Sequence, residues 1–322
     1  MRPLEVTPFA SRPLAGGFDD ASYDAVIAAL GYEKRARRIS EKLADRTEAK
    51  VAIAFSDHTD RDDYKENERF FESADFAIER LGQLKISGWM KSWLAALAEN
   101  SDRPLSLAID VSSLSRVRIA RLLAPLTAHK LDSPVSVDFL YTPAGYEPAG
   151  VEPEITEVNG PVTEWFSGWA PNPRRAVVAF VGLGYEPDRA TGAIEHIEPG
   201  FIWAFTPGGE DARYDDAMHE ANKWLFEDLQ EMEDRILGYE VNDPFACYAT
   251  LEGLVFDELL RGRRPVLVPM GPKIFALVSM LVALRHRPWP AVWRLSPGDY
   301  AAALPRDSGG KLVGIRVVFP PF

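Results

Sequence analysis

Thiol and imidazole groups are scarce in this sequence, which narrows the chemistry open to it. The single cysteine, Cys247, excludes an internal disulfide and a zinc site built from several thiolates. Its apolar surroundings predict a buried core residue rather than a nucleophile. The five histidines show no pair at metal-ligand spacing, and neither a GxSxG nor an HExxH motif is present. We therefore expect no metal ion and no cofactor, and metal-dependent and serine hydrolysis lose support.

Long apolar runs and excess positive charge are also missing. No run reaches the ~18 to 20 residues that a membrane span requires, and the first 20 residues lack a signal pattern, so we expect a cytoplasmic protein without a membrane partner. The 48 acidic and 36 basic residues give a net charge of −12, which argues against duplex nucleic acid as the main partner. Basic clusters at 34–38 and 261–264 are most simply solvated helix faces, although one would suffice for a small phosphorylated ligand.

Two short motifs recur at nearly the same offset. Gly-Tyr-Glu follows an apolar run at 31–33 and again at 184–186, an offset of 184 − 31 = 153 residues. Pro143 and Tyr146 recur as Pro297 and Tyr300, an offset of 297 − 143 = 154 residues. These recurrences predict an internal duplication, in which the chain contains two tandem copies of one α/β unit.

Apolar runs of strand length alternate with stretches of helical spacing along most of the chain. The predicted strands are residues 24–30, 51–55, 105–110 and 135–142 in the first half, and 176–183, 201–205, 266–270 and 291–295 in the second. Apolar strands separated by helices predict a parallel sheet covered on both faces. The expected fold class is α/β, with two tandem Rossmann-like units from an internal duplication, each a mostly parallel sheet with helices on both faces.

Proline and glycine content suggests how the chain divides. We expect an extended N-terminal arm at 1–20, a first unit at 21–146, a crossover linker at 147–174 and a second unit at 175–322. The crossover has room for an edge hairpin, and residues 312–319 are predicted to add a final edge strand to the second unit.

Both Gly-Tyr-Glu triplets fall at the carboxyl end of a predicted strand, where open parallel sheets bind their ligands. Glycine there permits a close backbone approach, tyrosine can stack on a flat ring, and glutamate can accept hydrogen bonds from a ribose or an amine. A plain turn glycine and a glutamate that favours a helix N-terminus are the simpler interpretation of one triplet alone. The candidate ligand-binding residues are Gly31, Tyr32, Glu33, Gly184, Tyr185 and Glu186.

The third predicted strands end differently in the two halves. The first leads into Asp110, Ser112 and Ser113, which either cap the next helix or contact a ligand. The second leads through Gly271 to Lys273 at the start of a helix. That turn is either a seat for a phosphate or a capped helix with a surface lysine.

Carboxylates offer a catalytic alternative. Glu33, Glu186 and Asp110 are candidates for a general acid or base, and the two glutamates could pair across a pseudo-twofold axis. The acidic loop at 57–63 could hold magnesium, although a solvated loop is the simpler interpretation.

The two triplets and the turn from Met270 to Lys273 give the chain a resemblance, over residues 22–300 and in architecture, to the CRISPR-associated Rossmann-fold (CARF) sensors and the related SAVED domains. Those families pair Rossmann-like units and bind cyclic or linear oligonucleotide messengers in the groove between them. The resemblance implies a ligand-sensing module of a prokaryotic defence or stress system. It would bind a nucleotide-type anion at the carboxyl ends of the strands or between the two halves.

Roles follow from this resemblance as expectations. Lys273 would hold a phosphate that the backbone of Gly271 approaches, and Tyr32 or Tyr185 would stack a base. No nuclease, protease or DNA-binding effector domain is evident in the sequence, so a partner chain is expected to supply the output. Two alternatives stay open: a nucleotide-processing hydrolase or transferase of the same fold, and a non-catalytic scaffold whose acidic surface docks a basic partner.

Overall fold

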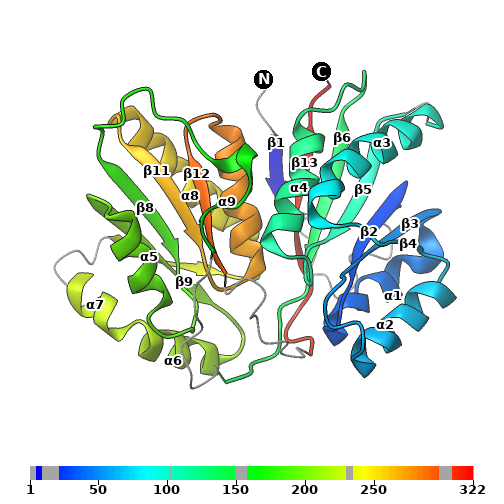
Figure 1. The fold of residues 1–322 in the computed structure, drawn as a ribbon, viewed down its shortest axis with the longest axis horizontal. Helices are drawn as coiled ribbons and strands as arrows, with labels where there is room; N and C mark the ends of the chain where they lie inside the picture. The colour runs from blue at the N-terminus through cyan, green and yellow to red at the C-terminus, as the bar shows by residue number, and fades with distance from the viewer. Residues whose placement is uncertain are drawn as a thin grey trace. The chain divides into compact units, whose positions relative to one another are not determined.

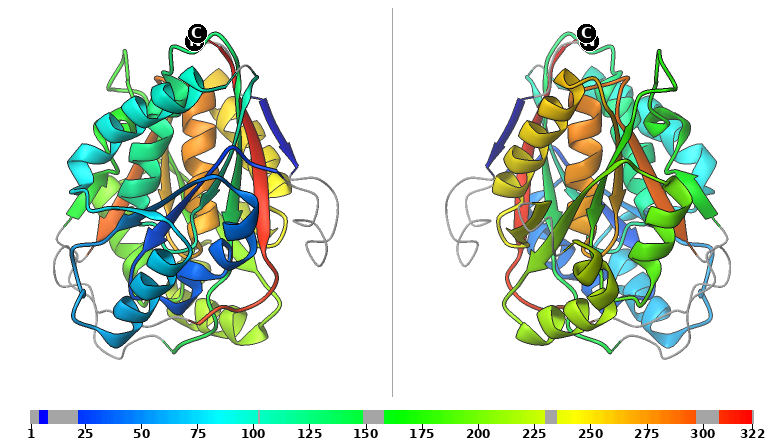
Figure 2. Two further views of the ribbon diagram at one scale, coloured as in Figure 1. Left: turned by 90° about the vertical axis from the view of Figure 1, so that its right-hand side faces the viewer. Right: turned by 90° about the vertical axis from the view of Figure 1, so that its left-hand side faces the viewer.

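The computed structural model describes residues 5–8, 22–101, 103–148, 158–229, 235–296 and 307–321. The chain forms two compact units, which are described separately. Unit 1 comprises Met1–Gly145 and Ala303–Phe322, and unit 2 comprises Tyr146–Ala302. Within each unit, helices cover both faces of one sheet (Figures 1 and 2).

In the described residues, unit 1 is built on a seven-stranded sheet of order β1-β13-β6-β5-β2-β3-β4. Its strands are β1 (Glu5–Pro8), β2 (Ala25–Leu30), β3 (Ala49–Ala54), β4 (Ala77–Glu79), β5 (Leu105–Asp110), β6 (Val135–Tyr141) and β13 (Val313–Phe319). Strands β2 to β6 are mutually parallel, whereas β13 is antiparallel to β6 and β1 is antiparallel to β13. Its helices are η1 (Lys34–Arg37), α1 (Ser40–Leu43), η2 (Ala44–Arg46), α2 (Asp62–Ser73), η3 (Gln83–Lys85), α3 (Ile86–Glu99) and α4 (Arg116–Thr127).

In the same described residues, unit 2 is built on a six-stranded sheet of order β10-β9-β8-β11-β12-β7. Its strands are β7 (Val158–Pro161), β8 (Val177–Gly182), β9 (Phe201–Gly208), β10 (Ile236–Glu240), β11 (Arg264–Pro269) and β12 (Ala291–Ser296). All pairs are parallel except β12 with β7. Its helices are η4 (Glu164–Phe166), α5 (Arg189–Ile197), α6 (Ala212–Ala221), α7 (Lys223–Leu229), α8 (Pro244–Leu260) and α9 (Lys273–Arg285).

The two sheets share one topology. Numbering the parallel strands of each unit in chain order gives 3-2-1-4-5 in both, with an antiparallel strand added beside strand 5. This is the strand order of a Rossmann-like sheet, in which the connections on either side of strand 1 run in opposite directions. The predicted α/β fold class with two Rossmann-like units is therefore confirmed.

The division of the chain differs from the predicted one at three places. Strand β13, expected in the second unit, instead pairs with β6 of unit 1. The buried carboxylate of Asp138 on β6 holds β13 in this position, because it accepts hydrogen bonds from the guanidinium of Arg316 on β13. The same carboxylate also accepts a hydrogen bond from Tyr23 Oη. The expected crossover belongs to unit 2 and contributes β7, an edge strand that pairs with β12. Within the expected N-terminal arm, residues 5–8 form β1, and the rest of the arm lies outside the described residues.

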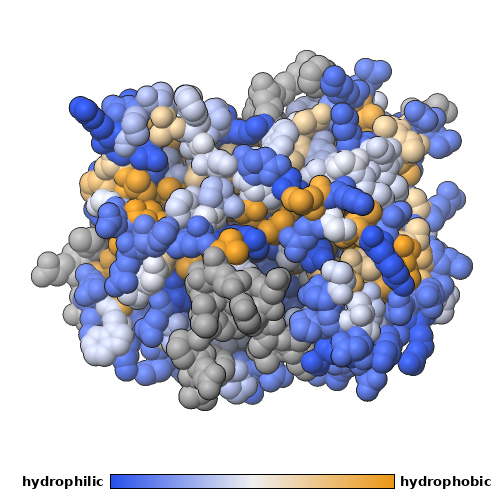
Figure 3. All heavy atoms as spheres, viewed as in Figure 1, coloured by the Kyte–Doolittle hydropathy of each residue, from blue (hydrophilic) through white to orange (hydrophobic). Residues whose placement is uncertain are grey.

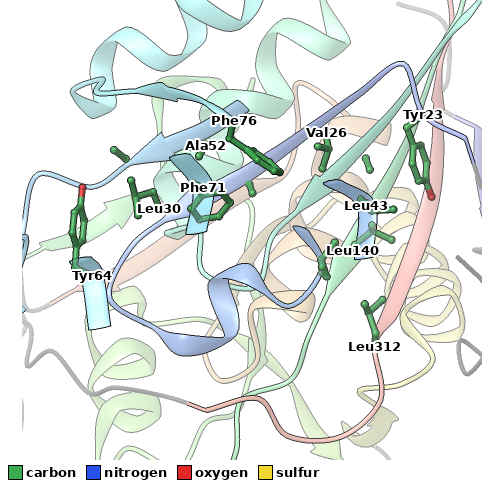
Figure 4. Packing of buried hydrophobic residues seen from close by; sticks show 14 residues of the cluster. Tyr23, Val26, Leu30, Leu43, Ala52, Tyr64, Phe71, Phe76, Leu140 and Leu312 are labelled. Carbon is green, nitrogen blue, oxygen red and sulfur yellow. The ribbon is translucent and has the colours of Figure 1, made fainter. Parts of the chain in front are cut away.

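Hydrophobic cores fill the space between each sheet and its helices. In unit 1, Val26 and Ala52 from the sheet pack with Leu43 and Phe71 from α1 and α2 (Figure 4). Helix α9 of unit 2 is buried along its whole length from 274 to 284, which its almost uninterrupted apolar sequence requires.

Surface properties agree with the composition. The face in Figure 3 carries mainly hydrophilic residues, with hydrophobic residues in separate patches. Cys247 is buried, and desolvation with the nearby Asp243 raises the pKa of its thiol to about 12, so it is no nucleophile. Among the described residues, no helix combines the length and apolar character that crossing a membrane needs.

Candidate ligand-binding sites at the strand ends

Each unit has a switch point between the carboxyl ends of its first and fourth parallel strands. In unit 1 these strands are β2 and β5, and in unit 2 they are β8 and β11. Open α/β sheets leave a crevice at this place, because the helices that follow the two strands cover opposite faces. The predicted site residues all lie at the carboxyl ends of these four strands, in the loops that follow them or at the start of the next helix.

The glycine of the unit 1 triplet is fixed by close packing and by a buried amide. A Cβ at Gly31 would lie 2.5 Å from Phe55 Cδ2, so only glycine fits beneath that ring. The Asn67 side chain donates to the carbonyl oxygens of Gly31 and Glu33, at 2.8 and 3.0 Å. Asn67 is 1% exposed and comes from α2, so this helix holds the shape of the turn.

Glu33, the glutamate of the same triplet, is held by an ion pair and by a hydrogen bond from a serine. Glu33 Oε2 accepts hydrogen bonds from Arg35 Nε at 2.5 Å and from Ser113 Oγ at 3.2 Å. Burial alone would lower the pKa of Arg35, but the Glu33 carboxylate and Tyr141 together raise it. The Arg35 guanidinium also donates to the carbonyl of Thr142, just beyond β6. The structure thus brings Glu33 and Ser113 together from β2 and β5.

Asp110, the last residue of β5, and Ser112 form hydrogen bonds with the loop backbone after β5 and β6 and do not cap helix α4. Asp110 Oδ1 accepts from the backbone N–H of Ser112 at 2.8 Å, and Ser112 Oγ accepts from the Thr142 N–H at 2.8 Å. Helix α4 is capped instead by Ser115, whose hydroxyl accepts from the Arg118 N–H. The capping interpretation of Asp110, Ser112 and Ser113 is therefore wrong.

Tyr32 is surrounded by residues of the loop after β3. Its ring meets His58 edge-on at 5.1 Å between centroids, and the Arg61 guanidinium lies 5.5 Å from its centroid. Magnesium in this acidic loop finds no support, because among the described residues no three His, Cys, Asp or Glu side chains gather closely enough to bind a metal.

In unit 2 the two glycines of the switch point touch. Gly271 has φ +66°, and a Cβ there would lie 2.3 Å from the Leu183 carbonyl oxygen and 3.3 Å from Gly184 Cα. A Cβ at Gly184 would in turn meet the Gly271 backbone nitrogen at 3.0 Å. The turns after β8 and β11 therefore pack backbone against backbone, which requires glycine on both sides.

A second buried asparagine repeats the role of the first. Asn222, between α6 and α7, donates to the carbonyls of Gly184 and Met218 at 2.7 and 2.8 Å. Sequence reasoning missed this pair. The signal was present, because Asn67 and Asn222 are separated by 222 − 67 = 155 residues, close to the offset of the triplets.

Three half-buried tyrosines gather beside the glycine contact of unit 2. Tyr185 and Tyr214 lie 5.4 Å apart between ring centroids, and Tyr146 lies 6.2 Å from Tyr185 and 5.2 Å from Tyr214. The Arg213 guanidinium covers Tyr146 at 4.9 Å. This cluster of Tyr146, Tyr185 and Tyr214, the tyrosine cluster, joins a triplet residue to two rings that the sequence did not link to it.

The remaining candidates of unit 2 flank this cluster. Glu186 Oε1 lies 3.9 Å from an Arg189 guanidinium nitrogen, and both residues are partly exposed. Lys273 is the first residue of α9, with Pro272 as its N-cap and no side-chain cap bond. Glu186 belongs to unit 2 and Glu33 to unit 1, so the expected carboxylate pair has its members in separate units.

Comparison with known proteins assigns this chain to no family. No protein-family model matches the chain, and no curated protein matches it. One similar structure is a type III CRISPR defence DNA nuclease activated by cyclic oligoadenylate, with 10% identity and a TM-score of 0.49. The match covers 84% of this chain, which spans 65% of the length of the nuclease.

Two further structures are less similar. The cytoplasmic domain of a prokaryotic cation chloride cotransporter is 9% identical over 87% of this chain and 97% of its own, with a TM-score of 0.23. Anabaena HepE in complex with UDP-glucose is 11% identical over 77% of this chain and 81% of its own, with a TM-score of 0.19. Function is therefore inferred below from the residues of the two sites.

Proposed function

We propose that this protein is a ligand-sensing module that binds a nucleotide-type anion at the carboxyl ends of its parallel strands, as CARF and SAVED domains do in prokaryotic defence or stress systems. The observation that supports it best is the tyrosine cluster beside the Gly184–Gly271 contact. Partly exposed aromatic rings suit a base, and backbone brought close by glycine suits a phosphate. In this proposal Tyr185 stacks the base while Gly271 and Lys273 hold the phosphate.

The geometry of α9 favours an anion at this place. The N-cap of α9, Pro272, offers no side-chain hydrogen bond to the first turn of this 13-residue helix. The positive end of the helix dipole and the Lys273 ammonium both favour negative charge there.

Catalysis by Glu33, the enzyme alternative, has less support. Glu33 Oε2 already accepts hydrogen bonds from Arg35 and Ser113, so this oxygen holds the turn instead of exchanging a proton with a substrate. In the proposal Glu33 fixes the turn that carries Tyr32 and, like Glu186, contacts the ligand. The output of the sensor is assigned to a partner chain.

Isothermal titration calorimetry with mono-, di- and cyclic oligonucleotides tests the proposal. We expect at least one nucleotide to bind, and Tyr185→Leu and Lys273→Ala each to weaken it about tenfold or more, the scale of a lost stacking or charge-assisted contact. Lys223→Ala is the matched control, because this lysine pairs with Glu220 on the surface of unit 2. Unchanged affinity in both site variants contradicts the site assignment.

The same panel separates the alternatives. Turnover of a nucleotide that is lost in Glu186→Gln would establish the enzyme reading. If no nucleotide binds or reacts, a partner protein captured only at low salt would establish the scaffold alternative. Salt screens the attraction between charged surfaces, so binding through an acidic surface weakens as the ionic strength rises.

A further inference from the structure

An arginine that the site described above does not use is buried at the strand ends of unit 1. Arg118 lies in the first turn of α4 and is 4% exposed. Its guanidinium carbon sits 3.7 Å from the centroid of the Phe55 ring, and that ring covers Gly31 of the triplet. Arg118 therefore reaches from the helix after β5 across the switch point to the residue after β3.

The charge of Arg118 is not balanced by a close partner. In the described residues its guanidinium makes no hydrogen bond or ion pair, and its buried Nε atom is unsatisfied. Burial lowers the pKa of Arg118 to about 10, with the exposed Asp57 carboxylate opposing the shift. The group therefore stays cationic at neutral pH, and a buried charge without a counter-ion is costly.

Arg35 shows how the same unit treats a buried arginine that has a structural role. It is 2% exposed, and it is bonded to the Glu33 carboxylate and to the Thr142 carbonyl. Stacking on Phe55 is favourable, but a cation over an aromatic ring recovers only part of what burying the charge costs. Packing alone therefore accounts poorly for Arg118.

The surroundings of Arg118 favour an anion. It lies at the N-terminus of a 12-residue helix, where the helix dipole attracts negative charge. In the loop after β3, the Arg61 guanidinium lies 5.5 Å from the centroid of the Tyr32 ring. A cation from the loop after β3 thus stacks on Tyr32, and a cation from the helix after β5 stacks on the Phe55 ring that covers the neighbouring Gly31.

We propose that Arg118 is the anchor for a phosphate group at the switch point of unit 1, next to Tyr32 and the N-terminus of α4. This inference rests on the proposed function and extends it, because it gives unit 1 an anion seat of its own, separate from Lys273. The ligand chemistry is a phosphate monoester or diester, whose oxygens accept from the guanidinium fork.

Inorganic phosphate is the probe for the seat itself. Thermal unfolding is followed in phosphate and in chloride at equal ionic strength, in a Lys273→Ala background that removes the seat of unit 2. We expect phosphate to raise the midpoint, and Arg118→Met to weaken the apparent phosphate affinity about tenfold or more. Without phosphate, Arg118→Met should be as stable as the parent or more stable, since it removes an uncompensated charge.

Two matched variants sharpen this test. Arg103→Met removes the same charge from the amino end of β5, where Arg103 is exposed and pairs with Asp24, and it should leave the phosphate response unchanged. Asp57→Asn removes a carboxylate whose charge acts on Arg118, and it should strengthen phosphate binding. If Arg118→Met instead lowers stability and keeps the phosphate response, Arg118 is a packing residue and the inference is overturned.

Titration with AMP separates this inference from the proposed function. Binding of AMP that Arg118→Met leaves unchanged overturns the anchor and leaves the proposed function standing. A phosphate response that depends on Arg118, together with no binding of AMP or of any oligonucleotide, supports the seat and removes the nucleotide proposal.

Discussion

Replacing Gly271 by alanine should destabilise unit 2 more than its backbone angle alone explains. At φ +66° an alanine costs about 1–2 kcal/mol, because its Cβ crowds the backbone. The added Cβ would also lie 2.3 Å from the Leu183 carbonyl oxygen, whereas real Cβ contacts do not fall below 3.0 Å. The two turns must therefore separate by at least 3.0 − 2.3 = 0.7 Å, and overpacking of this kind costs a further ~1–3 kcal/mol.

Gly262 provides the matched control for this prediction. It also has a positive φ, +74°, but a Cβ there would first meet the flexible guanidinium of Arg175, at 3.4 Å. Gly262→Ala should therefore cost only the conformational term, about 1–2 kcal/mol. Urea unfolding followed by tryptophan fluorescence suits the comparison, since six of the eight tryptophans belong to unit 2. Equal losses in the two variants would refute the backbone contact between the turns.

Two other predictions follow from buried polar groups. Asn67→Ala and Asn222→Ala should each cost about 1–3 kcal/mol in urea unfolding, because a buried glycine carbonyl loses its donor in each unit. Burial lowers the pKa of His129, with its bond to the Phe319 carbonyl opposing, so the unfolded chain binds the proton more tightly. Stability should therefore fall as the pH drops below the ordinary histidine value of about 6.5, and less so in His129→Gln, which thermal unfolding between pH 7 and 5 would reveal.

Local patterns predicted the parallel strands that are apolar throughout, and missed the short ones. Strands β4 and β10, the third of each unit, lie where the sequence predicts no strand. β4 has only three residues, and both are edge strands with partly exposed side chains, so neither gives a continuous apolar run. The stretch of helical spacing between the first two predicted strands is likewise divided into η1, α1 and η2.

The residue pattern of one strand does not predict which distant strand it pairs with. The partner of β13 is specified by one opposite charge in each of two apolar strands, Asp138 and Arg316, which stand opposite each other in the register. They are 316 − 138 = 178 residues apart, so the pairing becomes visible only when the two strands are compared directly. The same holds for the tyrosine cluster, which draws Tyr146 and Tyr214 to a triplet residue from far along the chain.

The glycine and the glutamate of the recurring triplet need different explanations. Its glycine is accounted for by the fold, because a buried asparagine takes the glycine carbonyl in both units and a neighbouring group leaves no room for a Cβ. Its glutamate is not accounted for in this way. Glu33 is held by Arg35 and Ser113, whereas Glu186 stands near Arg189, so the two carboxylates recur with different partners. A residue kept at the same place by different contacts is better explained by a shared task, and a ligand at each switch point would provide one. Glu33→Gln and Glu186→Gln should then weaken the same nucleotide in the calorimetric panel, although their structural surroundings differ.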